Sequence, residues 1–234
     1  MRALFIFPHP DDESYGPGRF MHSLQRQGHE VYLLTLTRGE ATKQRFRLGV
    51  DKAEMGRIRY GEMLDVQKTL NIRQMDVWDF PDSGLKDMDP RELEKAIRAH
   101  LDKTNPDVII TYPVHGISGF YDHLVCHALV KRVFVEWREE RDRPKRLAFF
   151  GPTEEQAAQS TWFPLKGLKE DDIDCVVTVE AGDIEANKRA LDCYKSYRET
   201  NDNSGIKDML SPEMYFEFFG ESHDPPLNDI FGKM

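Results

Sequence analysis

The sequence predicts an α/β fold in which one mostly parallel, Rossmann-like sheet carries helices on both faces. Short apolar runs recur along the chain, each four to seven residues long, which is typical of strands buried on both faces. Segments with helical spacing separate these runs, and this alternation indicates a parallel sheet. The predicted strands are Ala3–Phe7, Val31–Thr37, Asp76–Phe80, Val108–Tyr112, Leu147–Phe150 and Cys175–Val179.

The predicted helices follow from apolar stripes and terminal signals. The helix after Met88 has the clearest start, because Asp89 can cap it, Pro90 suits the first turn and Glu92 completes a capping-box-like spacing. Four further helices are predicted. The first is centred on residues 20–24 and ends near Gly28, and the second has an apolar stripe over residues 58–70. The third and fourth run over about 122–139 and about 184–197.

Two regions give weaker signals. The segment Gly151–Asp174 is irregular, and we interpret it as an inserted loop. The tail from about Asn201 has few pattern signals and is interpreted as an ordered flap or a partly mobile end. Because no repeat, low-complexity tract or linker interrupts the chain, we expect residues 1–234 to form a single domain.

Composition excludes several classes of protein. The chain has 234 residues, of which 39% are hydrophobic and 31% charged, as in globular proteins. No apolar run approaches the ~20 residues of a membrane span, and a net charge of −9 argues against a broad nucleic-acid surface. The three cysteines, Cys126, Cys175 and Cys193, form no CxxC pair, so we expect reduced thiols, a cytoplasmic location and no cysteine-based metal site.

Chemically rich segments follow three of the predicted strands. They are Pro8–Glu13 (PHPDDE), Thr37–Glu40 (TRGE) and Pro113–His123. In an open parallel sheet the carboxyl ends of the strands share one edge, and ligands bind there. We therefore expect these segments to converge, although more than a hundred residues separate the first from the last.

The first segment has the composition of a metal site. Three adjacent acids, Asp11, Asp12 and Glu13, repel one another and need a cation or a helix N-terminus nearby. A histidine, a carboxylate and a distant second histidine make a catalytic zinc set with one open position. The alternative is a solvated loop before a helix; the complete PHPDDE string directly after a buried strand favours the metal site.

The last segment supplies the second histidine. His123 and His127 lie one helical turn apart and share a face. We interpret His127 as a packed helix residue and His123, nearer the strand end, as the ligand. Asp122, beside it, is placed to orient a ligand or a catalytic group.

At these residues the chain resembles the PIG-L, or LmbE-like, family of zinc-dependent N-acetyl-sugar deacetylases. The family's PHPDD motif stands intact as Pro8–Asp12, and its GHPDH-type motif corresponds to Gly119–His123. Looser matches occur at Thr37–Glu40, Arg59–Glu62 and Pro81–Gly84, and the resemblance covers roughly residues 1–200.

The resemblance implies a role for each matched position. Asp11 would be the general base, and substrate would be a small-molecule N-acetyl sugar conjugate of the N-acetylglucosamine type. Related enzymes often assemble, so a homo-oligomer is one option, and the sequence leaves the oligomeric state open. The same ligands also suit Fe²⁺. The implied Zn²⁺ ligands are His9, Asp12 and His123, and the implied substrate-contacting or supporting residues are Glu40, Arg59 and Asp82.

Phe120 departs from the family, which usually has a histidine there that serves as an acid or stabilises the oxyanion. Either Asp11 performs both proton transfers, or His115 reaches in from the same loop, or activity is altered or lost. A later stretch, Tyr194–Tyr197, also departs from the family pattern and leaves the precise substrate open.

Two further alternatives concern charge and function. Basic residues outnumber acids between Arg38 and Arg59, which predicts either a positive rim for an anionic substrate or an ordinary solvated loop. Arg59 and Glu62 could also simply pair. The function favoured is removal of an acetyl group from an N-acetylated amino sugar or glycoside; the alternatives are a zinc hydrolase of another amide or ester, and a catalytically weakened sugar-binding relative.

Overall fold

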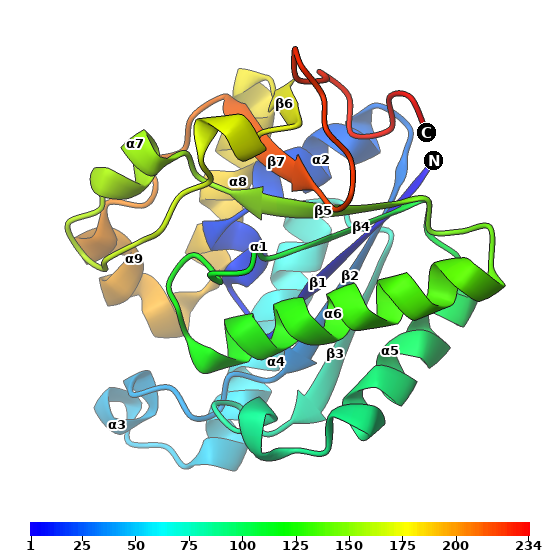
Figure 1. The fold of residues 1–234 in the computed structure, drawn as a ribbon. Helices are drawn as coiled ribbons and strands as arrows, with labels where there is room; N and C mark the ends of the chain where they lie inside the picture. The colour runs from blue at the N-terminus through cyan, green and yellow to red at the C-terminus, as the bar shows by residue number, and fades with distance from the viewer.

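A seven-stranded sheet organises the protein, with the strand order β3-β2-β1-β4-β5-β7-β6. The computed structural model describes residues 1–234 (Figure 1). Strands β1 to β5 pair in parallel, whereas β7 runs antiparallel to both of its neighbours. The strands are β1 (Arg2–Phe7), β2 (Glu30–Thr37), β3 (Gln74–Phe80), β4 (Val108–Thr111), β5 (Arg146–Gly151), β6 (Cys175–Thr178) and β7 (Glu213–Phe218).

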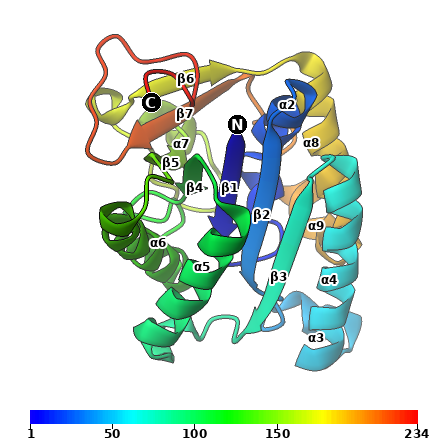
Figure 2. The same ribbon diagram turned by 90° about the vertical axis from the view of Figure 1, so that its right-hand side faces the viewer.

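Helices cover both faces of the sheet. Figure 2 shows α4 and α8 on one side of the strands and α5 and α6 on the other. The helices are α1 (Asp12–Tyr15), α2 (Gly18–Arg26), α3 (Gln44–Leu48), α4 (Lys52–Thr69), α5 (Pro90–Thr104), α6 (Tyr121–Glu140), α7 (Glu154–Ala158), α8 (Ala181–Cys193) and α9 (Arg198–Ser204). Three short 3₁₀ turns are Leu85–Asp87, Glu170–Asp172 and Lys195–Tyr197.

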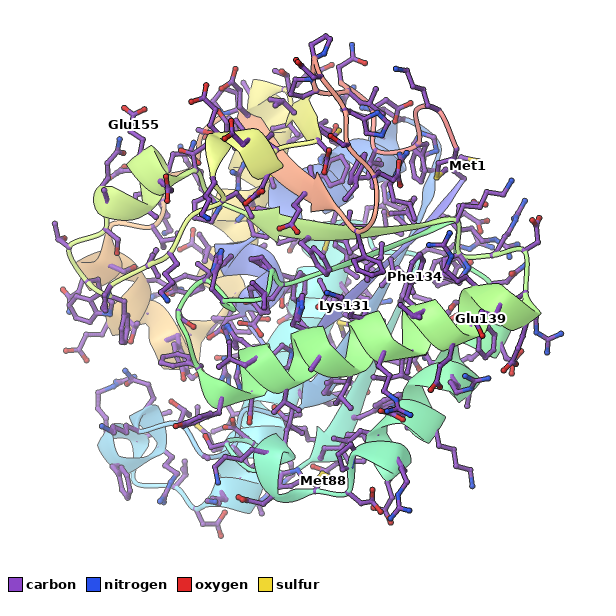
Figure 3. The ribbon with its side chains drawn as sticks, in the orientation of Figure 1. Met1, Met88, Lys131, Phe134, Glu139 and Glu155 are labelled. Atoms are coloured by element: carbon purple, nitrogen blue, oxygen red, sulfur yellow. The ribbon has the colours of Figure 1, made fainter.

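Each face of the sheet has its own apolar core. Phe5 and Phe7 of β1 face the core that α2, α4 and α8 complete, and Leu4 and Ile6 face the core under α5 and α6. Because helices cover both sides of the sheet, both faces of β1 are buried, which explains its apolar run from Ala3 to Phe7. Phe134, between α6 and the strands in Figure 3, is only 1% exposed.

All six predicted strands are present, and the predicted α/β class with a mostly parallel sheet is confirmed. The helix expected to reach 197 ends earlier, at Cys193, because Tyr194 leaves the helical backbone with ψ 71° and a 3₁₀ turn follows. The segment interpreted as an inserted loop, Gly151–Asp174, contains α7, which begins with a capping box between Thr153 and Gln156.

The tail has more structure than its sequence signals suggested. It contributes β7, which lies inside the sheet between β5 and β6. Met214, Phe216 and Phe218 alternate with half-buried or exposed residues and are buried themselves, as expected for an antiparallel strand with one well-covered face. That alternation was visible in the sequence and is the signal that could have found the strand.

None of the helices combines the length and the apolarity that crossing a bilayer requires. All three cysteines are free, and Cys126 and Cys175 are buried.

Candidate active site

The loop after β1 places two neighbouring carboxylates in different directions. The backbone of Asp11 has a φ of 85°, in the left-handed region that residues other than glycine rarely adopt. Helix α1 begins at the next residue. The Asp12 carboxylate turns back and accepts the backbone N–H of His9 at 2.8 Å. The backbone N–H of Asp11 donates to the Tyr194 hydroxyl at 2.8 Å. The bend is therefore held at both aspartates.

His9, Asp12 and His123 form a group that could hold a metal ion. One ligand atom from each lies within 4.8 Å of the others. The Nδ1–H of His123 donates to the Gly116 carbonyl at 2.9 Å, which leaves Nε2 with its lone pair, 3.4 Å from Asp12 Oδ1. Tyr112 donates its hydroxyl to the same Asp12 oxygen at 2.7 Å. These hydrogen bonds orient two of the three ligands.

Two more carboxylates orient His9. Its Nε2 lies 3.2 Å from Asp122 Oδ2 and 3.3 Å from Asp82 Oδ1, so this nitrogen carries the proton and Nδ1 faces Asp12 at 3.5 Å. Asp122 also accepts the backbone N–H of Ser83 at 2.7 Å. A second candidate metal group consists of His9, Asp82 and Asp122. Its one histidine, His9, also belongs to the first group.

The electrostatics fit a divalent cation. Burial acts to lower the pKa of His9, but hydrogen bonds to Asp12, Asp122 and Asp82 raise it well above its usual value. Burial acts to raise the pKa of Asp12, but His123 and His9 hold it well below its usual range. Asp122 Oδ1 is buried without a hydrogen-bond partner. Buried carboxylates therefore surround two imidazoles. Imidazole nitrogens together with carboxylate oxygens are a donor set that binds divalent metal ions.

Asp11 is paired with Arg59 of α4. The guanidinium Nη2 lies 2.6 Å from Asp11 Oδ2 and donates to the Pro10 carbonyl at 2.6 Å. Burial raises the pKa of Asp11 although Arg59 opposes the shift. Arg59 passes so close to Gly39 that a Cβ there would collide with the guanidinium, so only glycine fits beside it. Tyr197 packs its ring under the guanidinium at 4.3 Å.

These groups open into one cavity of about 620 Å³. The polar part of its wall includes His9, Asp11, Asp12, Arg59 and His123. Four aromatic side chains that also line it are substantially exposed: Phe120 (49%), Tyr121 (68%), Trp162 (47%) and Phe163 (46%). Figure 1 shows α1, α9 and the start of α6 on the same side of the molecule, where segments distant in sequence meet.

The family model that describes PIG-L, the GlcNAc-PI de-N-acetylases, matches residues 4–134. The chain belongs to the PIG-L family. The matched range runs from β1 into α6 and contains every histidine and carboxylate of the candidate metal group.

Two curated relatives are similar to this chain in sequence, and one solved structure is similar to it in fold. A 1D-myo-inositol 2-acetamido-2-deoxy-alpha-D-glucopyranoside deacetylase of Thermomonospora curvata is 28% identical over 152 residues, 56% of this chain and 51% of the relative. A probable N-acetyl-alpha-D-glucosaminyl L-malate deacetylase 2 of Bacillus cereus is 31% identical over 142 residues, 59% of this chain and 64% of the relative. The chain thus spans about half to two thirds of these curated relatives.

The structural neighbour shows the same fold. The zinc-inhibited form of teicoplanin deacetylase superposes with a TM-score of 0.74 at 14% sequence identity, covering 96% of this chain and 99% of that one. The PIG-L fold therefore extends over β5, β6 and β7, beyond the range that the family model matches.

The PIG-L motif residues meet in space, but not all of the predicted residues line the cavity. Asp82 does, whereas Glu40 lies behind it and accepts the Asp82 backbone N–H at 2.9 Å. A substrate contact for Glu40 stays a prediction; the geometry gives it a supporting place. The Arg59–Glu62 pair does not form, because Glu62 accepts hydrogen bonds from Ser196 instead.

His115 and His127 are not part of the candidate metal group. His115 does not line the cavity, and its Nδ1 accepts the backbone N–H of Ile117 at 3.1 Å. His127 donates through Nδ1 to the Tyr112 carbonyl at 2.9 Å and packs on Phe149, as expected for a packed helix residue. Phe120 lines the cavity with its ring centroid 5.5 Å from that of His123.

Sequence reasoning missed three residues of the site. Tyr112 has the spacing of an ordinary apolar strand residue, and Tyr194 stands out in the sequence only within a stretch that departs from the family pattern; neither signal predicts a hydrogen bond to the loop after β1. Arg19 had a visible signal: it is a charged residue directly before the apolar stripe of α2, at a position that the structure buries to 7% exposure.

Proposed function

We propose that the protein is a zinc-dependent hydrolase that removes the acetyl group from an N-acetylated amino sugar conjugate of the N-acetylglucosamine type. The observation that carries the proposal is the His9–Asp12–His123 group with Asp11 beside it on the wall of one cavity. Membership of the PIG-L family and the deacetylase names of its relatives support the choice of reaction.

Each ligand of the proposed metal has its own support. His9, Asp12 and His123 would hold the ion, and Tyr112, Asp122 and Asp82 would keep those ligands oriented. A divalent ion supplies Lewis-acid polarisation of the amide carbonyl and lowers the pKa of a water from 15.7 to about 7. Two imidazoles with one carboxylate favour Zn²⁺, and Fe²⁺ accepts the same ligands.

Asp11 is the proposed general base. Its side chain is directed to Arg59 and is not one of the proposed metal ligands, so it remains able to take a proton from the attacking water. Arg59 keeps one carboxylate oxygen fixed at 2.6 Å and leaves the other for proton transfer.

Asp11 also has to return that proton to the leaving amine. Phe120 has no group that donates a proton, and His115 does not line the cavity. Among the side chains near the metal group, a protonated Asp11 is the donor that the geometry favours, and its raised pKa makes protonation easier.

The cavity suits a conjugate larger than a single sugar. Its volume of about 620 Å³ lies in the middle of the range for small-molecule sites. Arg59 and Asp82 line the wall beside the proposed metal and are the proposed contacts for sugar hydroxyl groups, with Glu40 supporting Asp82.

A cytoplasmic location and a homo-oligomeric assembly are part of the proposal. The location is supported by the free thiols of Cys126 and Cys175, which suit a reducing compartment.

The test begins with the metal. The purified protein is analysed for bound metal, and acetate release is followed on a panel of N-acetylglucosamine conjugates before and after chelation. We expect zinc in near-stoichiometric amount, turnover of at least one conjugate, loss with chelator and recovery on adding Zn²⁺. Release from other amides or esters alone would move the assignment to a different hydrolase. Metal binding and sugar binding without any turnover would identify a catalytically weakened relative.

A further inference from the structure

Arg19 is a buried cation on the wall of the cavity. It is the second residue of α2 and is only 7% exposed. Its Nε donates to the Ser211 carbonyl at 2.8 Å and its Nη1 to the Gly16 carbonyl at 3.1 Å. Both acceptors are neutral, so the positive charge of the guanidinium has no counter-charge in these contacts.

The other buried arginines are paired. Three arginines of the chain are buried, Arg19, Arg59 and Arg146. Arg59 forms an ion pair with Asp11, and Arg146 forms one with Glu221. Arg19 forms none. Burial lowers the pKa of Arg19 to about 10, and no neighbouring carboxylate opposes that shift.

A carboxylate in the cavity wall that could pair with Arg19 is engaged elsewhere. Glu213 also lines the cavity, but its carboxylate accepts the Tyr215 hydroxyl and makes no ion pair with Arg19. Arg19 Nη2 donates to no atom of the protein, and it is not among the fully buried atoms that lack a partner. This nitrogen is therefore free to donate to a molecule in the cavity.

A buried guanidinium without a counter-charge is unfavourable for the folded protein, because it loses hydration and gains no ion pair. A ligand that supplies an oxyanion would remove this penalty at the moment of binding. The planar fork of the guanidinium matches the oxygens of a carboxylate or a phosphate better than it matches a neutral hydroxyl.

We propose that Arg19 binds an anionic group, a carboxylate or a phosphate, of the molecule that occupies the cavity. The identity of that molecule as an N-acetyl sugar conjugate rests on the proposed function; the anion site does not. Because Arg19 bonds to Gly16, whose backbone N–H donates to the Asp12 carbonyl at 3.0 Å, the anion is anchored to the same turn that carries a metal ligand.

The proposal makes the substrate bifunctional. The N-acetyl group would bind at the candidate metal group and the oxyanion at Arg19, which lines the same cavity. Arg19 is therefore a specificity-determining residue. It acts on binding of the conjugate and takes no part in proton transfer.

The experiment compares matched conjugates on the metal-loaded enzyme. Methyl N-acetylglucosaminide is neutral, carboxymethyl N-acetylglucosaminide carries a carboxylate, and N-acetylglucosamine 1-phosphate carries a phosphate. A charge-assisted hydrogen bond contributes enough free energy for a preference of roughly ten- to a hundredfold in kcat/KM. We expect wild type to prefer one anionic conjugate by that factor through KM, and the better of the two identifies the anion.

Variants then assign the preference to one residue. Arg19→Gln should reduce the preference to near one, Arg19→Lys should keep part of it because the charge remains, and Arg91→Gln, an exposed arginine on α5, should leave it unchanged. Thermal melting of each variant checks folding. If Arg19→Gln does not fold, Arg19→Lys is the test of the anion site. A preference for the anionic conjugate below that of wild type supports the proposal, and a preference equal to wild type contradicts it.

Binding separates this proposal from the proposed function. Calorimetry of the three conjugates with metal-loaded protein gives dissociation constants that need no turnover. One outcome is that no conjugate is deacetylated but an anionic conjugate binds more tightly than the neutral one, and that this difference depends on Arg19. This outcome would support the anion site and contradict the proposed deacetylase function. Equal binding of neutral and anionic conjugates by wild type, or an unchanged preference in Arg19→Gln, overturns the anion site.

Discussion

The cavity has two parts that are built in different ways. The metal part, which contains the candidate metal group, comes from loops at the carboxyl ends of parallel strands. Its side chains are held by hydrogen bonds to the backbone, as at Asp12 and His123, and to one another, as between His9 and Asp122. The outer part, from residue 150 onward, is formed by α7, α9 and the strand β7, and is mostly apolar and aromatic. We therefore expect the chemistry to depend on the first part and the stability of the fold to depend on the second.

The largest effect is expected from removing a metal ligand. His123→Ala should abolish both metal binding and turnover, because only His9 and Asp12 then remain in the group. Metal content and acetate release measure this. His127→Ala is the matched control on the same helix, and its metal content should equal that of wild type. Unchanged zinc in His123→Ala would place the ligand elsewhere.

Removing the base should separate chemistry from metal binding. Asp11→Asn keeps the shape of the side chain but cannot take a proton, so kcat should fall about 10²–10⁴-fold while metal content stays the same. Metal analysis and single-turnover kinetics on the loaded enzyme check both halves of this expectation. A fall of less than tenfold would remove Asp11 from the role of base.

The outer part can be tested through stability. Phe216→Ala in β7 empties a fully buried position beside Phe20, and unfolding free energy should fall by about 3–5 kcal/mol. Urea denaturation measures the loss. Val114→Ala, at a position 69% exposed, is the control and should change little. A small loss in Phe216→Ala would mean that the tail contributes little to the core.

Phe120 joins the two parts, since it lines the cavity and packs near both His123 and Phe163. Phe120→His introduces a second proton donor and should raise kcat several-fold, up to the lower end of the range for acid catalysis, about 10²-fold. A pH–rate profile should gain a limb from the new imidazole. Equal kcat for both proteins would show that Asp11 alone suffices.

The smallest expected effect is a pH dependence of stability at the ion pair between Arg146, the first residue of β5, and Glu221, which follows β7. Hydrogen bonds and charge from Arg146 lower the pKa of Glu221, although partial burial opposes this. A carboxylate with a lowered pKa stabilises the fold above its unfolded pKa of about 4.3, and this stabilisation is lost as pH falls through the lower folded value. Glu221→Gln should therefore melt below wild type at pH 7, and the difference should shrink toward pH 3. A constant difference would contradict the titration.

Prediction from sequence worked best for the metal part. The strand before Pro8 is apolar from Ala3 to Phe7 because it is buried on both faces, and a parallel sheet brings its end together with the end of the strand before Tyr112. Those two facts placed His9 near His123. β7 was not predicted, because local sequence does not show that it pairs with β5 and β6, which lie more than thirty residues earlier in the chain.

Local sequence by itself determined six of the seven strands, the long helices and the candidate metal-binding side chains, since periodicity and short motifs act over a few residues. The tertiary structure decided which groups have partners. Arg59 meets Asp11 instead of Glu62, Tyr194 reaches the backbone of Asp11, and Arg19 is buried without any carboxylate. Charge pairing depends on distances in space, and the spacing of residues along the chain does not contain those distances.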